Sequence, residues 1–477
     1  MTSSHPSSHD FVPISLRMTQ PMPTESLVAM GFCDPQLSKN WLQFESDVTT
    51  LTRLLSRHSE QSWALCFNNS YWFSVAFMAT CHSQKHIVLP SNLQAAALAE
   101  LADSFDAILH DDVLEDAVFE QVQLTQHRHY SVSGAAYSEP LQELAYEASA
   151  VYFAPLENIN VTLFTSGSSG QPKAIQKPLE LLEREVAQLH ATWGSSLQNA
   201  NFASTVSHQH IYGLLFRVLW PLSAGKPFWA NNWQYPEQVE EHASENTVLI
   251  SSPALLKRLS NGKSNSSYKL IFSSGGPLSN EAANLCHRQF KLYPHEVLGS
   301  TETGGIAHRQ QLTAQTEWQT FVGTKADVNA EQCLKILSPL IELFDWYQTS
   351  DQCDLIDHNH FILKGRMDRV VKIEEKRISL TEVERRLNQL EQVEDAAVIS
   401  LQDPKRIIIA AAIQLSATGQ SQLELLGKGK FGLMLRKELH QWIEPVGIPR
   451  RFRFIDEIPL NTQGKRLVSE IERLFED

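Results

Sequence analysis

Apolar residues in the first half of the chain form two kinds of pattern, short uninterrupted runs and longer stretches that suit a helix. Short apolar runs predict buried strands at four places, residues 63–67, 86–90, 106–110 and 161–164. A longer run at 71–80, rich in Phe, Ala and Met, predicts a helix, and five apolar residues at helical spacing predict another, Leu179, Leu182, Val186, Leu189 and Trp193. Strands that alternate with helices are typical of a parallel sheet covered by helices.

The last hundred residues show a different mixture of elements. Ser379 and Glu382 have the spacing of a capping box, which predicts the start of a helix with Val383 and Leu387 on its apolar face. Two further apolar runs predict a pair of strands, residues 396–401 and 406–415. We therefore expect this part of the chain to form a compact α+β domain.

Length and composition place the chain among ordinary globular proteins. Its 477 residues suffice for about three domains, and 42% of them are apolar and 20% charged. The formal net charge of −14 argues against a general binder of nucleic acid or of anionic membranes, because both need a positive field. Residues 1–24, which open with a polar stretch, are expected to be a loose tail.

The distribution of cysteines and the hydropathy of the sequence indicate the cellular compartment in which the protein is expected. The six cysteines are scattered without a CxxC pair, which is typical of a reduced, cytoplasmic protein rather than of a disulfide framework. No stretch approaches the roughly 18 apolar residues of a membrane span. No apolar segment of a secretory signal follows the first ten residues. We therefore expect a cytoplasmic protein without a membrane span.

The strand predicted at 161–164 runs into a loop of hydroxyls and glycines that ends in a lysine. Gly167 and Gly170 allow backbone angles that other residues avoid, so the main chain can approach a ligand closely. Successive N–H groups can then form a concave anion site. Four hydroxyls and one ammonium group can add to it, those of Thr165, Ser166, Ser168, Ser169 and Lys173. The loop therefore predicts a phosphate site.

A Ser/Gly-rich loop of this kind has two other interpretations. A kinase-type phosphate loop needs Gly-Lys followed by Ser or Thr, but Pro172 stands between Gly170 and Lys173 here. A Ser/Gly-rich surface turn without a ligand stays open from the loop alone. The sequence TSGSSGQPK closely resembles the phosphate-loop signature of the adenylate-forming superfamily, which includes acyl-CoA synthetases, luciferases and peptide-synthetase adenylation domains.

A pair of histidines, His208 and His210, follows further along the chain. A metal site would need a Cys, Asp or further His nearby, and none is present, so a hydrogen-bonded histidine at a helix start is the alternative. His210-x-x-Gly213 matches the superfamily's histidine-glycine motif, which implies that both residues border the carboxylate substrate. Amino-acid-activating relatives carry an Asp near this motif, but residues 202–216 contain none. The substrate is therefore expected to be a medium-length or aromatic monocarboxylic acid.

A glycine-rich turn after residues 270–273 resembles the superfamily's adenine-flanking motif. These four residues read as a strand, and the turn offers bare backbone against which a flat ring can lie. The resemblance implies ATP or AMP binding by Gly275, Gly276 and Pro277.

A second strand end delivers a hydroxyl, Thr301, and a carboxylate, Glu302, into another glycine-rich turn. A carboxylate beside a triphosphate is unfavourable unless a cation lies between them, so Glu302 predicts a Mg²⁺ ligand. The segment resembles the superfamily's catalytic "TE" motif, which implies catalytic roles for both residues and nucleotide contacts for Leu298, Gly299 and Ser300. Relatives carry an aromatic residue where Leu298 stands, and it stacks on adenine there.

Three more motifs resemble those of the superfamily in the expected order. Asp351, within Thr-Ser-Asp, implies an acceptor for the ribose hydroxyls, although relatives carry Gly in place of Ser350. Arg366 and Asp368 match the hinge motif, which implies that Arg366 contacts ribose or phosphate and that Asp368 is the pivot. Lys465, preceded by glycine near the C-terminus, implies the catalytic lysine.

The resemblance implies a fold and a reaction. It predicts a large N-terminal α/β domain with layered sheets and helices, residues 25–367, and a small mobile α+β domain, 368–477, joined by a hinge. It also predicts an AMP-forming acid–thiol ligase. With ATP and Mg²⁺, such an enzyme converts a carboxylic acid to an acyl-adenylate and releases pyrophosphate.

The acceptor thiol is expected to belong to a holo acyl carrier protein. Coenzyme A ligases carry a glycine where Glu375 stands, and a glutamate there adds bulk and negative charge against the pantetheine arm. Residues 428–466 hold nine Lys or Arg against four Asp or Glu, a surface that suits an acidic carrier. Free coenzyme A is the alternative acceptor. A ligase with a non-thiol acceptor and an inactive nucleotide-binding homologue stay open as well.

Overall fold

A computed structural model gives the fold of the chain. It describes residues 11–476 apart from 32–36, 91–92, 94, 112–127, 133–152, 167–171, 261, 263–265, 314, 343–344, 367–368, 374–375, 404–405, 441–442, 444 and 462–465. The chain divides into two compact units. The first comprises residues 1–316, 321–323 and 338–345, and the second comprises the remainder. The predicted boundary between residues 367 and 368 stays a prediction.

The first unit contains a sheet with the strand order β6-β5-β3-β4-β7-β8. Its strands are parallel except that β8 runs antiparallel to β7. The strands are β3 Ser62–Cys66, β4 His86–Leu89, β5 Ala107–His110, β6 Arg128–Ser131, β7 Asn160–Ser166 and β8 Pro172–Pro178. The strands predicted at 63–67, 86–90, 106–110 and 161–164 are therefore confirmed.

A second sheet of the same unit has the strand order β14-β13-β12-β11-β9-β10-β1-β2. Neighbours from β12 to β1 are parallel, and β13 also runs parallel to β12. The strands are β1 Leu27–Met30, β2 Lys39–Asn40, β9 Asn201–Ser204, β10 Phe228–Trp229, β11 Thr247–Ser251, β12 Leu270–Ser273, β13 His295–Ser300 and β14 Gly304–Gln310.

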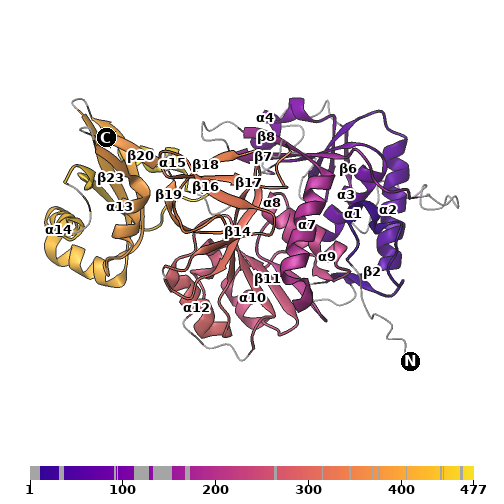
Figure 1. The fold of residues 1–477 in the computed structure, drawn as a ribbon, viewed down its shortest axis with the longest axis horizontal. Coiled ribbons are helices and arrows are strands. Elements are labelled where there is room, and N and C mark those ends of the chain that lie inside the picture. Colours follow the sequence, from indigo (N-terminus) through magenta and orange to yellow (C-terminus); the bar gives the residue numbers. More distant parts are fainter. Residues whose placement is uncertain are drawn as a thin grey trace. The chain divides into compact units, whose positions relative to one another are not determined.

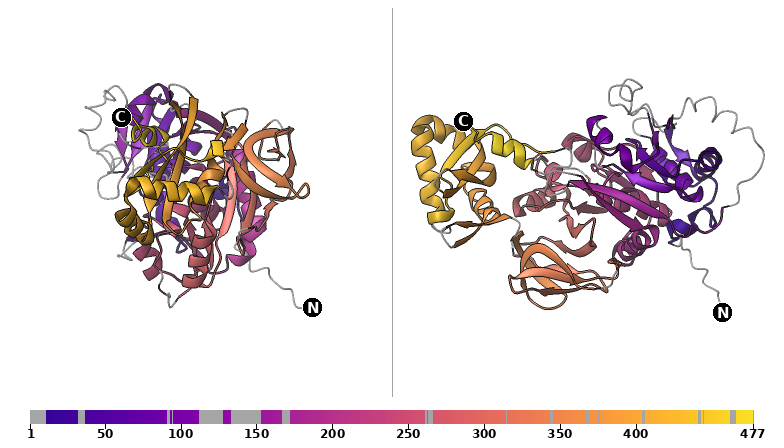
Figure 2. Two further views of the ribbon diagram at one scale, coloured as in Figure 1. Left: turned by 90° about the vertical axis from the view of Figure 1, so that its left-hand side faces the viewer. Right: turned by 90° about the horizontal axis from the view of Figure 1, so that it is seen from above.

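Three long helices lie between these two sheets, α2 Trp41–Ser56, α3 Ser70–His82 and α7 Leu179–Trp193 (Figures 1 and 2). Alternate residues of a strand face opposite sides of its sheet. In β3, Trp63 packs into the core cluster that includes these helices, whereas Ala64 packs into a smaller cluster around helix α4 Ala95–Glu100. Helix α12 Asn280–Phe290 covers the far face of β11 and β12. The unit is thus built in alternating layers of helices and sheets.

Helix α3 is apolar around its whole circumference because it lies at the centre of the core. Every residue from 70 to 81 is buried. Asn69 caps the helix by accepting hydrogen bonds from the backbone N–H groups of Tyr71 and Trp72. Helix α7, in contrast, buries one stripe, which is the stripe predicted from Leu182, Val186 and their neighbours.

The N-terminal segment differs from the loose tail predicted for residues 1–24. Residues 1–10 lie outside the described part, but residues 11–24 include the short helix α1, Ile14–Arg17. Ile14 and Met18 are buried in the core of the first unit, and the backbone N–H of Val12 donates to Ser223 O at 2.8 Å. Val12 is buried as well, but prolines at 13, 21 and 23 interrupt any helical or strand period, so the sequence did not reveal this packing.

The second unit begins with antiparallel strands in the order β16-β17-β18-β19-β15, drawn in orange (Figure 2). A hairpin, β20-β21, follows. The C-terminal sheet then has the order β22-β23-β24. The strands are β15 Trp318–Thr320, β16 Lys325–Val328, β17 Cys333–Leu337, β18 Tyr347–Leu355, β19 His360–Arg366, β20 Val370–Ile373, β21 Lys376–Ser379, β22 Val393–Asp403, β23 Arg406–Leu415 and β24 Arg451–Ile455.

Helices cover both faces of the C-terminal sheet. Val398 and Ile409 pack against helices α13 Leu380–Leu387 and α14 Ala417–Leu439, while Ala397 and Ala410 face α15 Val468–Arg473. The predicted strand pair and the helix after residue 379 are therefore confirmed. Helix α14 bends at Gly427, whose φ of 75° and ψ of 156° only glycine adopts readily (Figure 1).

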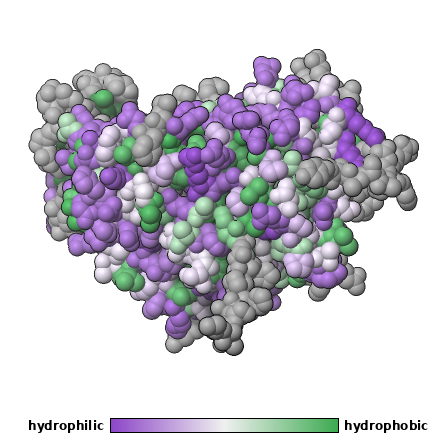
Figure 3. All heavy atoms as spheres, turned by 45° about the vertical axis from the view of Figure 1, so that its right-hand side comes forward, coloured by the Kyte–Doolittle hydropathy of each residue, from purple (hydrophilic) through white to green (hydrophobic). Residues whose placement is uncertain are grey.

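The surface and the helices bear on the expectations about membranes and cysteines. Figure 3 shows a mostly polar face on which apolar side chains are scattered. Among the described helices, none is both long and apolar enough to cross a bilayer. The described cysteines, Cys66, Cys81, Cys286, Cys333 and Cys353, are all buried and free of disulfides.

Candidate active site

The predicted phosphate loop connects the two strands of a hairpin. Strands β7 and β8 pair in antiparallel register, with Thr165 opposite Lys173 and Ser166 opposite Pro172. The predicted residues Gly167, Ser168, Ser169 and Gly170 lie outside the described residues. The hairpin nevertheless brings the first hydroxyl and the last ammonium group of the loop to neighbouring positions. One of these ends carries a contact with a distant part of the chain.

Lys173 forms an ion pair with Glu302, 129 residues further along the chain. The distance from Lys173 Nζ to Glu302 Oε1 is 3.2 Å, and the two side chains are 59% and 28% exposed. Partial burial acts to raise the pKa of Glu302, but hydrogen bonds from its own backbone, Lys173 and Ser300 outweigh this and leave the pKa below its usual value. Glu302 is therefore an ionised carboxylate beside the end of the predicted phosphate loop.

The turn that carries Glu302 is tightly built. Ser300 N donates to Thr303 Oγ1 at 3.1 Å, and Thr303 N donates back to Ser300 Oγ at 3.2 Å. A Cβ added to Gly299 would lie 2.5 Å from the carbonyl oxygen of Gly304, so the backbone closes only with glycine there. Thr301 is buried within the same turn. The predicted residues 299–302 therefore lie at the end of β13 and in the tight turn that leads to β14.

Two buried ionisable side chains, Glu185 and Lys177, lie close to this turn, and neither was predicted as a site residue. Glu185 of α7 accepts a hydrogen bond from Gly305 N at 2.7 Å. Burial raises the pKa of Glu185, while the nearby Lys177 and the Gly305 bond oppose that rise. Burial likewise lowers the pKa of Lys177. A readable signal existed, because Glu185 stands three residues after Leu182 and beside Val186, on the apolar stripe of its helix.

The predicted adenine-flanking turn lies at the same edge of the sheet as the Glu302 turn. Strands β12 and β13 are parallel, so the turns that follow them leave the sheet on the same side. Ser274 Oγ donates to Val297 O at 2.7 Å and ties the start of the first turn to strand β13. Gly275, with φ of +89°, and Gly276 both face open space, since no heavy atom lies within 4 Å of a Cβ built on either. A flat ring could lie against this backbone.

The two histidines have different surroundings. His208 is buried; its Nε2 donates to Phe67 O at 2.9 Å, and its Nδ1 accepts from Ser70 Oγ at 2.9 Å. A carbonyl can only accept, which fixes this neutral tautomer. Burial holds the pKa of His208 well below its usual value. His208 is thus a structural residue, and no cluster that could hold a metal occurs in the part of the chain that the structure describes.

His210 directly precedes the short helix α8, Ile211–Gly213, and occupies its N-cap position. A Cβ on Gly213 would lie 2.0 Å from Ser207 O, so glycine permits a close approach of two backbone segments. The chain continues as the π-helix η5, Leu214–Leu219. π-Helical turns are frequent at functional sites. The described geometry is compatible with the predicted acid-binding role of His210 and Gly213, which stays a prediction.

The remaining predicted site residues belong to the second unit. Asp351 of β18 and Arg366 of β19 are opposite each other in the strand pairing, and Asp351 N donates to Thr349 Oγ1 at 3.1 Å. Asp368, the predicted pivot, and Lys465, the predicted catalytic lysine, lie outside the described residues. The pairing places Asp351, the predicted ribose ligand, and Arg366, predicted to contact ribose or phosphate, on neighbouring strands.

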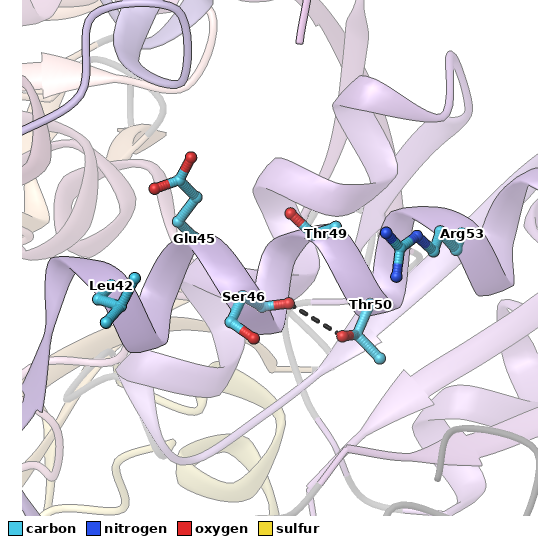
Figure 4. Close-up of a pocket in the computed structure, with 6 residues that line it drawn as sticks. All are labelled: Leu42, Glu45, Ser46, Thr49, Thr50 and Arg53. Carbon is cyan, nitrogen blue, oxygen red and sulfur yellow. Dashed lines mark hydrogen bonds between the residues drawn. The ribbon is translucent and has the colours of Figure 1, made fainter. Parts of the chain in front are cut away.

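A groove of about 360 Å³ runs along the surface of α2 (Figure 4). All six of its lining residues come from that helix, Leu42, Glu45, Ser46, Thr49, Thr50 and Arg53. It contains none of the residues predicted to bind nucleotide or acid, and we assign it no role.

Comparison with known proteins agrees with these observations. The sequence profile of the family described as AMP-binding enzyme matches residues 25–336. The chain belongs to the AMP-binding enzyme family. It is 24% identical over 310 residues to a 4-coumarate–CoA ligase of Rhodobacter capsulatus, which covers 65% of this chain and 75% of that relative.

The chain is also similar to a carrier-protein ligase in sequence and to a solved structure in fold. A D-alanine–D-alanyl carrier protein ligase of Staphylococcus epidermidis is 23% identical, over 64% of this chain and 69% of its own. The solved structure of ATP-bound MatB from Rhodopseudomonas palustris has a TM-score of 0.81 at 14% identity, covering 98% of this chain and 99% of its own. The predicted superfamily and its fold class, a large α/β domain with layered sheets and a smaller C-terminal domain, are confirmed. The chain is an enzyme of the acid–thiol ligase type.

Proposed function

We propose that this AMP-binding enzyme uses ATP to activate a carboxylic acid as an acyl-adenylate and then transfers the acyl group to a thiol. The observation that carries the proposal is the ion pair between Lys173 and Glu302 at 3.2 Å. It joins the end of the predicted phosphate loop to the predicted metal carboxylate. When a nucleotide arrives, the cationic member can turn to a phosphate and the anionic member to a metal ion.

In the first step, a carboxylate oxygen of the acid attacks the α-phosphorus of ATP. The bond between that phosphorus and its bridging oxygen breaks, and pyrophosphate leaves. Lys173 and the hydroxyls of the phosphate loop would hold the outer phosphates. Glu302 would hold Mg²⁺, which when bound would neutralise part of the phosphate charge. Lys465 would neutralise the charge that develops on the transferred phosphoryl group.

The remaining site residues would hold the adenosine. Gly275, Gly276 and the Leu298–Ser300 segment would contact adenine, supported by the open space at both glycines. Asp351 would accept hydrogen bonds from the ribose hydroxyls, and Arg366 would contact ribose or phosphate.

The acid is proposed to be a medium-length or aromatic monocarboxylic acid rather than an amino acid. No acidic residue occurs from 202 to 216, so nothing there would hold an ammonium group. The stretch from 202 to 220 is also largely uncharged, which supports an apolar site. Exchange of labelled pyrophosphate into ATP, measured across fatty, aryl, hydroxy and amino acids, tests this. Strong exchange with a proteinogenic amino acid would contradict it.

In the second step, the thiol sulfur attacks the acyl carbon, the bond from that carbon to AMP breaks, and the thiol proton leaves. We propose an acyl carrier protein as the thiol donor. The basic excess of residues 428–466 supports this, as do Lys428 and Lys430, both exposed beside Leu425, which is 84% exposed. An acidic carrier would be drawn to such a surface, with a salt-dependent effect on encounter rate.

The test supplies the adenylated acid with either free coenzyme A or a set of holo-carrier proteins. Transfer should be faster to at least one carrier and should slow as salt is added. Faster transfer to coenzyme A than to every carrier would identify an ordinary acyl-CoA synthetase, a possibility that the similarity to 4-coumarate–CoA ligase keeps open.

A further inference from the structure

A buried carboxylate, Glu384, joins two distant parts of the second unit. Its Oε1 accepts from Arg369 Nη2 at 2.6 Å and from Val398 N at 2.7 Å. Its Oε2 accepts from Arg369 Nη1 at 2.7 Å and from Arg466 Nη1 at 2.6 Å. The Glu384 side chain is only 7% exposed. Both oxygens are therefore fully used, which is the geometry of a strong, charge-assisted contact.

The two arginines stand beside the two mobile features predicted for this unit. Arg369 directly follows the predicted pivot, Asp368, and also donates to Val398 O at 2.6 Å. Arg466 directly follows the predicted catalytic Lys465 and also contacts Asp395 Oδ1 at 2.8 Å. We call these four charged residues, Arg369, Glu384, Asp395 and Arg466, the Glu384 cluster.

The backbone around Arg466 is also fixed. Arg466 forms an isolated antiparallel bridge with Leu460, and Leu467 N donates to Pro459 O at 3.0 Å. Main-chain contacts therefore hold the residues on both sides of the stretch 461–465, which we call the lysine segment because it contains Lys465. The side chain of Arg466 anchors the C-terminal end of the lysine segment to Glu384 on α13. Because consecutive Cα atoms lie about 3.8 Å apart, the position of Arg466 limits the positions open to Lys465.

We infer that Glu384 is a positioning residue for the adenylate-forming step. Through Arg466 and Arg369, it joins the C-terminal end of the lysine segment to the residues that follow the pivot. Both parts therefore move as one body when the small domain rotates. This inference rests on the proposed function for the role of Lys465. A misplacement of about 1 Å at a reacting group can cost roughly a hundredfold in rate, so a loosely held lysine segment would slow adenylation.

Glutamine at position 384 is a sharp perturbation because it keeps the volume and removes one acceptor. An amide has a single oxygen, and its NH₂ group would face arginine donors. If the oxygen keeps the bonds to Val398 and Arg369, the bond to Arg466 is lost. Glu382→Gln is the matched control, since Glu382 lies on the same helix and pairs with Arg385 and Arg386 rather than with the cluster.

Three measurements on the full chain test the inference. Glu384→Gln should raise amide hydrogen exchange in residues 459–467 while β22 and β23 stay protected. It should lower pyrophosphate exchange by between about 10- and 100-fold. Thioester formation from pre-made acyl-adenylate should fall less than about threefold, because the lysine no longer acts then. Arg466→Gln should reproduce these effects, and the double variant should be no worse than either single variant.

Each contrary outcome has a distinct meaning. Unchanged hydrogen exchange at 459–467 in Glu384→Gln would overturn the inference whatever the activity. Equal loss in both half-reactions, with a lower melting temperature, would show a merely structural role and would overturn it too. If the wild type exchanges pyrophosphate with no acid, the proposed function fails, while the hydrogen-exchange comparison with Glu382→Gln still decides whether Glu384 holds the lysine segment.

Discussion

Replacing Glu302 by glutamine should lower the affinity of the active site for Mg²⁺ far more than it lowers the stability of the fold. The ion pair with Lys173 is 3.2 Å long, but the lysine side chain is 59% exposed and the glutamate 28%. Pairs this exposed contribute about 0.2–1 kcal/mol, so its loss should lower the melting temperature by less than about 4 °C. Glutamine keeps the shape and removes the ligand charge that attracts a hard divalent cation.

The same numbers predict an opposite effect for Lys173. Before Glu302 can bind Mg²⁺, its contact with Lys173 must break, at a cost of up to about 1 kcal/mol, which is about a fivefold change in affinity. Lys173→Met should therefore tighten binding of Mg²⁺ alone by up to about fivefold, while it weakens ATP binding. Glu302→Gln should raise the Mg²⁺ concentration for half-maximal rate by about tenfold or more.

The assay is pyrophosphate exchange at fixed ATP over a Mg²⁺ series, with Glu245→Gln as the control. Glu245 is an exposed residue of the same unit, so its replacement changes the net charge equally. If the Glu302→Gln titration overlays that of the wild type, Glu302 is structural and its assignment to the metal is wrong. If Glu245→Gln shifts the titration as much, the effect is only long-range charge.

Three further predictions concern catalysis, backbone packing and pH. Lys465→Ala should slow adenylate formation by about a hundredfold or more but thioester formation from pre-made adenylate much less, and equal loss in both would contradict the two-step role. Gly213→Ala should lower the melting temperature, since overpacking costs about 1–3 kcal/mol, whereas Gly276→Ala, which faces open space, should not; equal melting curves would refute this. Burial lowers the pKa of His82 and His295 to about 4, so between about pH 4 and 6.5 the unfolded chain binds more protons than the folded one. The free energy of unfolding should therefore fall as pH drops through this range, by at most about 1.4 kcal/mol per pH unit for each histidine. Constant urea midpoints over that range would refute this.

The local sequence predicted much of the fold because the decisive patterns are short. Apolar runs of four or five residues identified β3, β4, β5 and β7, and the stripe from Leu179 to Trp193 identified α7, since burial of one face is written in adjacent positions. Glycine-rich turns at strand ends likewise identified the segment around Glu302 before any contact was known.

The tertiary structure alone decided which of these residues meet. The contact of Lys173 with Glu302 depends on how the layers of the first unit stack, and no local pattern encodes a separation of 129 residues. The position of Glu185 on an apolar helix stripe indicated burial, but only the folded chain supplies its partner, the backbone N–H of Gly305. Glu384 lies in a helix that the sequence predicted, but its partners Arg369 and Arg466 come from segments 15 residues before it and 82 residues after it. The sequence by itself determined the elements and their chemistry, and the packing determined the charged contacts, because a buried charge needs partners that only the folded chain can supply.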